Sequence, residues 1–105
     1  MTAKYATISI GKKCNTQSHV TPVHLACINP NVAVLKTLLD QAPDFNMQDS
    51  SLAKPIHYAA ACESSGPLKL LLELGANLND LDNFKRTALH WAAFAGRAEN
   101  VKIIL

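Results

Sequence analysis

The chain has 105 residues and a formal net charge of +2, with 49% hydrophobic and 17% charged residues. This composition is typical of one globular domain, and because no apolar run approaches the ~20 residues that span a bilayer, we expect no direct membrane insertion. The Lys and Arg residues are scattered and form no basic stripe, which argues against a nucleic-acid partner.

The first segment, residues 1–17, allows two interpretations. Residues 10–15 align weakly with residues 74–79, which would make the segment a remnant of an earlier repeat of the kind described below. The alternation of Ile8 and Ile10 with other residue types equally favours a short strand. Both interpretations stay open at this point.

The rest of the chain repeats itself every 33 residues without insertion. The heptapeptide TPVHLAC at residues 21–27 is followed by KPIHYAA at 54–60 and by TALHWAA at 87–93. A fixed period lays like groups along a line, whereas catalysis needs unlike groups at one point, so we expect no enzyme. The period predicts units at residues 18–50, 51–83 and 84–105, the last of them truncated.

Each unit is predicted to contain two short helices and a polar loop. Thr21 and Thr87 are good N-caps for a first helix, whereas Lys54 in the second unit replaces the capping hydroxyl at a cost of about 1 kcal/mol. Gly96 and Gly75 are expected to end a first and a second helix in the left-handed conformation. The second helices carry aliphatic side chains at helical spacing.

These patterns resemble the ankyrin-repeat family, whose 33-residue unit carries a Thr-Pro-Leu-His motif. The resemblance covers about residues 11–105 and implies an all-α solenoid of stacked helix-turn-helix units with projecting hairpin-like loops. Asp49 and Asp82 occupy matching positions in those loops. Leu52 and Lys85 stand where the family usually has a turn glycine, which leaves the turn geometry open.

The resemblance implies binding of a partner protein through the loop tips and the concave face of the first helices. Tyr, Trp and Arg are enriched at binding hot spots, which favours the third unit. Core packing is the competing interpretation for Trp91 and Tyr58, and a solvated charge for Arg86, whereas a loop-tip Phe84 has no obvious use within the chain. The candidate partner-binding residues are Phe84, Arg86, Trp91, Phe94, Asn83, Tyr58, Leu52 and Ile28.

The three repeated histidines, His24, His57 and His90, are predicted to form a ladder, because packed helices lie about 8–10 Å apart. Zinc needs all its ligands about 2 Å from one point, so the ladder predicts no metal site, and no cofactor is expected either. By resemblance to the family, each histidine is expected to tie its own turn to the next by hydrogen bonds.

The cysteines and one asparagine give further expectations. Cys27 aligns with alanines and is predicted to be a core residue, whereas Cys62 falls near the end of a first helix, where a side chain can be exposed. Three cysteines without paired spacing favour a reducing compartment, the cytoplasm or the nucleus. Asn46 lies in a Leu38–Asp44 context that resembles the target pattern of asparaginyl hydroxylases, so it is a candidate hydroxylation site.

Two function classes remain. We expect a protein–protein interaction module, a scaffold or targeting unit that holds one partner protein. The alternative is a regulatory or targeting ankyrin domain of a larger enzyme or channel, with this chain as a fragment. Ile103, Ile104 and Leu105 are apolar where a capping repeat is polar, which favours a fragment. We expect a monomer, with end-to-end association through this apolar end if the array is truncated.

Overall fold

The computed structural model describes residues 19–41 and 44–105, so both interpretations of residues 1–17 lie outside the described part of the chain. Within it, six helices and no strands form, which confirms the predicted all-α class. The helices come in three consecutive pairs. The pairs are α3 (Pro22–Ala26) with α4 (Val32–Gln41), α5 (Pro55–Ala61) with α6 (Gly66–Glu73), and α7 (Ala88–Ala95) with α8 (Ala98–Ile104).

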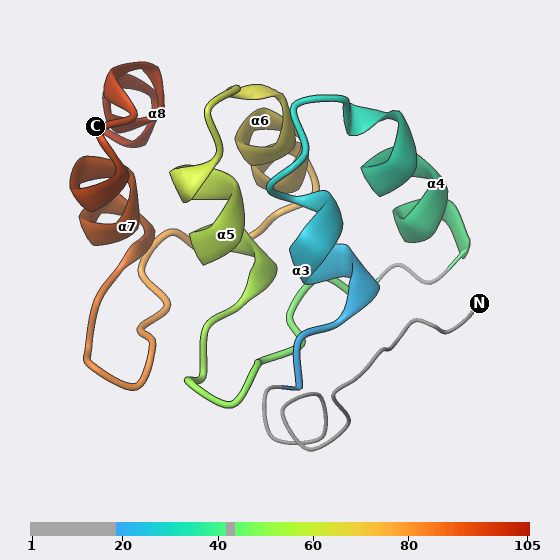
Figure 1. The fold of residues 1–105 in the computed structure, drawn as a ribbon, viewed down its shortest axis with the longest axis horizontal. Helices are drawn as coiled ribbons and strands as arrows, with labels where there is room; N and C mark the ends of the chain where they lie inside the picture. Colours follow the sequence, from blue (N-terminus) through green and yellow to red (C-terminus); the bar gives the residue numbers. More distant parts are fainter. Residues whose placement is uncertain (1–18, 42–43) are drawn as a thin grey trace.

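The three helix pairs stack side by side into two rows (Figure 1). The first helices of the pairs, α3, α5 and α7, form one row, and their partners α4, α6 and α8 form the second. The loops before α5 and α7 project together beyond the first row, at the lower edge of the view. This arrangement places three equivalent helices and two equivalent loops next to one another, so residues 33 apart in sequence become neighbours.

The starts of the first helices differ in their capping. The Thr21 hydroxyl accepts a hydrogen bond from the His24 amide at 3.3 Å, which stabilises the first turn of α3. Lys54, at the same place before α5, makes no side-chain bond to the helix, and its ammonium instead pairs with Asp80 at 2.9 Å. The predicted loss of a side-chain cap in the second repeat is therefore confirmed.

Backbone conformation at the helix ends and loop tips follows the repeat. Gly96 ends α7 at φ 75°, and Gly75 follows α6 at φ 98°, so both predicted left-handed glycines are confirmed. Leu52 and Lys85 also adopt a left-handed conformation, each at φ 62°. The turn therefore keeps its glycine geometry without glycine, although a side chain in that region costs about 1–2 kcal/mol.

The core lies between the two rows and between successive repeats. Small residues line the contacts of the first row, and aliphatic side chains from the second row close the core. The largest buried side chains include Leu35, Ile56, Leu68 and Leu71. Ala93 on α7 is exposed, because no described helix covers the side of α7 that faces away from α5. None of the described helices is long and apolar enough to cross a membrane.

Candidate protein-binding site

A buried carboxylate, Asp82, organises the loop before α7. Its Oδ1 accepts hydrogen bonds from the backbone amides of Phe84 and Arg86, each at 2.9 Å. Its Oδ2 accepts from the Arg86 side-chain Nε at 2.8 Å and from the Trp91 indole at 3.0 Å. Four donors therefore surround one carboxylate that is 4% exposed, and they fix the loop tip against the helix that follows.

The same arrangement recurs one repeat earlier around Asp49. Its Oδ1 accepts from the amides of Ser51 and Ala53 at 2.8 and 2.9 Å, and its Oδ2 accepts from the Tyr58 hydroxyl. The two loops are joined directly, because the Asn83 amide donates to the Ser51 carbonyl at 2.7 Å. The projecting loops are thus a rigid pair in which each acid anchors one aromatic side chain of the next helix.

These contacts shift two pKa values. Burial alone would raise the pKa of Asp82, but the hydrogen bonds from Arg86, Trp91 and Phe84 outweigh it and hold the pKa at about 2, against an ordinary 3.8. For Tyr58, burial, followed by the hydrogen bond to Asp49 and the charge of that carboxylate, raises the pKa well above its ordinary value. Asp82 is therefore a carboxylate, and Tyr58 a neutral phenol, at neutral pH.

The repeated histidines connect successive repeats. The His24 ring accepts from the Thr21 amide through Nδ1 at 3.1 Å, so its Nε2 carries the proton and donates to the Ala53 carbonyl at 2.9 Å. His57 does the same, with the carbonyls of Asp80 and Arg86 each 3.1 Å from Nε2. Both rings are fully buried. The expectation that these histidines tie one turn to the next is confirmed.

The third histidine differs from the other two in its surroundings. His90 accepts from the Thr87 amide through Nδ1 at 3.1 Å, as His24 does from Thr21, so the same orientation is imposed. The ring is nevertheless exposed, and its Nε2 has no hydrogen-bond partner among the described residues. A donor that is internal in two repeats is thus available to solvent in the third.

Three of the predicted contact residues, Phe84, Arg86 and Trp91, lie together around Asp82. The Arg86 guanidinium carbon is 4.8 Å from the centre of the Phe84 ring and 5.6 Å from that of Trp91. Phe84 is 67% exposed, yet it contacts Arg86, so the view that it has no use within the chain is corrected. The guanidinium is likewise not simply a solvated charge, because it pairs with Asp82.

The predicted competition between packing and binding is visible at Tyr58 and Trp91. Both are partly buried, and their rings stack on each other with centres 5.6 Å apart. Each ring also packs against the histidine of the preceding repeat, Tyr58 on His24 and Trp91 on His57. Both aromatics therefore have a packing role, while part of each stays open on the face of the first helices.

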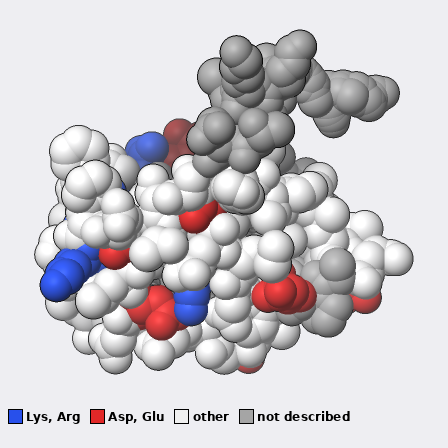
Figure 2. Space-filling model, turned by 90° about the horizontal axis from the view of Figure 1, so that it is seen from below, with Lys and Arg blue, Asp and Glu red and all other residues white. Residues whose placement is uncertain are grey.

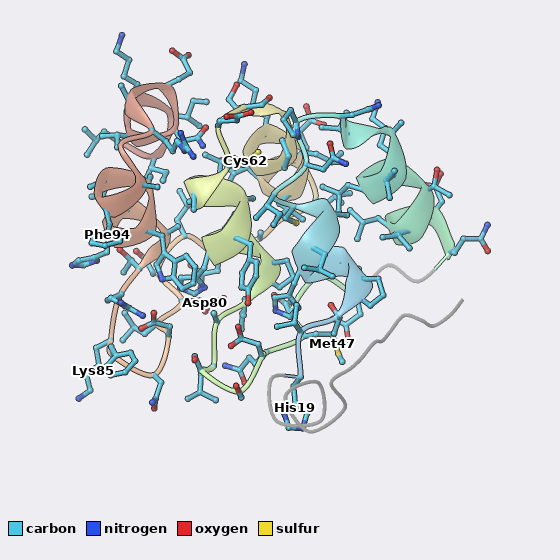
Figure 3. All side chains as sticks on the ribbon, viewed as in Figure 1. His19, Met47, Cys62, Asp80, Lys85 and Phe94 are labelled. Atoms are coloured by element: carbon cyan, nitrogen blue, oxygen red, sulfur yellow. The ribbon has the colours of Figure 1, made fainter. Side chains whose placement is uncertain are left out.

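The other candidate residues are more accessible. Phe94 on α7 is 96% exposed and makes no hydrophobic-core contact, and Figure 3 shows it at the end of the row of first helices. Ile28 and Leu52 are 49% and 44% exposed, and Asn83 is exposed at the loop. Beside Phe94, an open groove of about 520 Å³ is lined by Ala61, Arg86, His90, Trp91, Phe94 and Ala95.

On the face formed by the loop tips, the described residues do not gather positive charge in one place. In Figure 2, which looks onto these tips, Lys and Arg atoms lie apart from one another, and Asp and Glu atoms lie between them. Most of the visible described surface is uncharged. An uncharged surface with isolated charges suits a protein partner better than a phosphate backbone, which is bound by clustered Lys and Arg.

Sequence reasoning missed Asn100, which connects α8 to the end of α5. It is 1% exposed, and its side-chain amide donates to the Cys62 and Ala60 carbonyls at 2.9 and 3.0 Å. Arg97 adds a bond from Nε to the Ala61 carbonyl at 2.9 Å. Asn100 has no counterpart in the other repeats, where Pro67 and Val34 stand, so the repeat pattern carried no signal for it.

The two described cysteines are buried. Cys27 is a core residue as predicted, and burial, with a smaller effect of Cys62, raises its pKa to about 12. Cys62 was placed where it could be exposed, but it is 2% exposed. The reason is that α8 covers the end of α5 through Asn100. Among the described residues, no three His, Cys, Asp or Glu side chains lie close enough to hold a metal ion.

The candidate hydroxylation residue, Asn46, is exposed in the loop after α4. Its backbone amide donates to the Asp44 side chain at 2.9 Å, and Asn79 forms the equivalent bond with Asn77. The turn is therefore held by the residue two positions earlier. Hydroxylation of Asn46 stays a prediction, to be checked by intact-mass measurement for an added oxygen atom.

Comparison with known protein families agrees with the geometry. A family model described as ankyrin repeats, three copies, matches residues 3–82 and, in an overlapping second match, residues 23–105. Together the matches cover most of the chain. No curated protein sequence matched it significantly.

Proposed function

Because the chain belongs to the ankyrin-repeat family, whose members generally act as protein–protein interaction modules, we propose that it holds a partner protein on its third repeat. Domains of this family are typically non-catalytic. The proposed contact comprises the exposed side chains around Asp82 and along α7, extended across the first row of helices. Its residues are Phe84, Arg86, Trp91 and Phe94, with Asn83, Tyr58, Leu52 and Ile28 beside them.

The observation that carries this proposal is the exposure of Phe94. A phenylalanine that is 96% exposed gives nothing to the core, so its apolar area is available to a partner. It lies beside Trp91 and the Arg86 guanidinium in one groove, and Trp and Arg are the residue types that most often dominate binding energy. Burying such a group removes apolar area from water at little entropic cost, because the rings are rigid.

Affinity capture with variants tests the proposal. We expect a protein retained by the wild-type chain to be lost by a Phe84→Glu, Phe94→Glu double variant, because both substitutions place a charge at the contact without touching the core. Arg86 is left intact, since a reversed charge there would face the buried Asp82. Val34→Glu is the matched control, because Val34 is 50% exposed on α4 in the second row.

The retained proteins are identified by mass spectrometry, and each variant is first shown by circular dichroism to be as helical as the wild type. If the double variant keeps the partner while the Val34→Glu control loses it, the binding face is the second row. The proposed placement is then wrong.

A further inference from the structure

The polar side chains of the groove on α7 are hydrogen-bond donors. The Trp91 indole N–H and the Arg86 Nε are already bonded to Asp82, whose two oxygens accept four donors. The remaining N–H groups of the guanidinium have no partner among the described residues. No acidic side chain from the described part of the chain lines the groove. Its side chains therefore offer hydrogen-bond donors and a positive charge, without a carboxylate to receive them.

His90 supplies a second, independent observation. Its Nδ1 accepts from the Thr87 amide, so the proton lies on Nε2, and the His90 side chain is one of those that line the groove. In the two earlier repeats, the equivalent Nε2–H groups each donate to carbonyl oxygens at 2.9–3.1 Å. The His90 donor is held in the same way and has no acceptor among the described residues. Because the ring is exposed, this donor is open to solvent and available to an acceptor from a bound partner.

The apolar part of the groove accepts a large side chain. Trp91 and Phe94 face it from α7, and Ala61 and Ala95 leave room between them. Its volume of about 520 Å³ is within the range of sites that hold small ligands, so it accommodates one or two residues of a peptide. An apolar side chain placed there covers the most exposed aromatic ring of the described chain.

We propose that this groove binds an extended peptide segment of the partner in which a large apolar residue is adjacent to an Asp or Glu. The apolar side chain packs against Phe94 and Trp91, and the carboxylate accepts from the His90 Nε2–H and the outer N–H groups of Arg86. The inference rests on the proposed function and specifies the chemistry of its partner. A singly charged carboxylate fits better than a phosphate, because Asp82 already balances part of the charge of Arg86.

Selection of short random peptides displayed on phage against the whole chain tests the inference. We expect the selected peptides to share an acidic residue next to Leu, Phe, Ile or Met. Labelled synthetic copies are then titrated by fluorescence anisotropy. Replacing their acidic residue by the matching amide should weaken binding about tenfold, the size of one charge-assisted hydrogen bond. Higher salt should weaken the acidic peptides only.

Variants of the chain separate contact from stability. Phe94→Ala should weaken binding about tenfold or more, whereas Val34→Ala, at an exposed apolar position in the second row, should leave it within about twofold. Arg86→Gln keeps a donor for Asp82 but removes the charge. It should weaken the acidic peptide about tenfold and the amide peptide hardly at all, a coupling that a merely structural role of Arg86 does not produce.

Three results would overturn the inference: no peptide is selected, the selected peptides lack the acidic residue, or the amide peptides bind as well as the acidic ones. None of these decides the proposed function, which stands or falls with the loss of the captured protein in the Phe84→Glu, Phe94→Glu variant. A captured partner that depends on Phe94 but contains no apolar–acidic segment would support the proposed function and contradict the inferred peptide chemistry.

Discussion

At the scale of single residues, two aspartates act as anchors within the loops. Asp49 and Asp82 each accept two backbone amides through one oxygen and bind an aromatic side chain nine residues later through the other. A carboxylate that satisfies several N–H groups removes the cost of leaving them unpaired in a tight turn. The tips of the proposed binding face are consequently fixed before any partner arrives, which lowers the entropic cost of binding.

The lowered pKa of Asp82 makes stability depend on acid. Its pKa is about 2 in the folded chain against an ordinary 3.8, so its contribution is present above about pH 4 and is lost as the pH falls through 4 towards 2. By the linkage of pKa to free energy, the contribution is about 2 kcal/mol. We expect urea unfolding to show this decline, and Asp82→Asn to lower stability at pH 7 and flatten the decline. Asp40→Asn, at an exposed position on α4, is the control; equal pH profiles for both variants would contradict the assignment.

At the scale of the helices, hydrogen bonds between repeats satisfy backbone groups that a helix leaves unpaired at its end. The carbonyls at the end of α5 lack a partner within their own helix, and Asn100 and Arg97 from the third repeat provide donors to them. The amide oxygen of Asn100 itself is buried and has no hydrogen-bond partner within residues 19–41 and 44–105. That unpaired oxygen reduces the stabilisation that Asn100 contributes, but the N–H groups of the same side chain hold α8 against α5.

Removal of the Asn100 side chain should therefore be costly. Asn100→Ala leaves buried carbonyls without a donor, and we expect a loss of about 2 kcal/mol in the free energy of unfolding, measured by chemical denaturation. Lys102→Ala, at an exposed position of the same helix, should change stability by less than about 0.5 kcal/mol. Similar losses in the two variants would show that the buried amide contributes nothing specific.

The helices themselves were predictable because their signals are local. A hydroxyl cap at Thr21 and a glycine at Gly96 act on the helix beside them, and the 33-residue period is read directly from the sequence, so the helix pairs appear where these signals place them. The burial of Cys62 and the role of Asn100 were not predictable, because they depend on contacts between α5 and α8, which lie nearly 40 residues apart. The cluster around Asp82 is an intermediate case: the sequence pointed to its residues, but it did not predict the contacts between them.

At the scale of the whole molecule, the described chain is a stack of repeats joined by similar interfaces. Each repeat buries its apolar side against the next, so stability is shared between the repeats and their interfaces. The histidine bond is part of the junction between the first and second repeats and of that between the second and third. The histidine is buried in the first two repeats and exposed in the third, so its contribution to stability can be compared between buried and exposed positions of one molecule.

Substitution of two of the histidines by alanine measures what the junction contributes. His57→Ala removes a buried ring, an acceptor for the Lys54 amide and a donor to two carbonyls. We expect a loss of about 3 kcal/mol in urea unfolding. His90→Ala removes an exposed ring that bonds only to its own Thr87 among the described residues, and should cost about 1 kcal/mol. Equal losses would mean that the bond to the next turn contributes no stability.

The histidine bonds also give the stack a direction. The His24 and His57 rings each donate towards the repeat that follows in sequence, so one side of a repeat presents a donor and the opposite side presents the carbonyl that receives it. The two sides of a repeat therefore differ in hydrogen-bonding character. A twofold axis through the exposed side of α7 would bring His90 against its own copy, donor to donor and beside two Arg86 side chains. We therefore expect this face to take a partner that presents acceptors, rather than a second copy of the chain paired with it symmetrically.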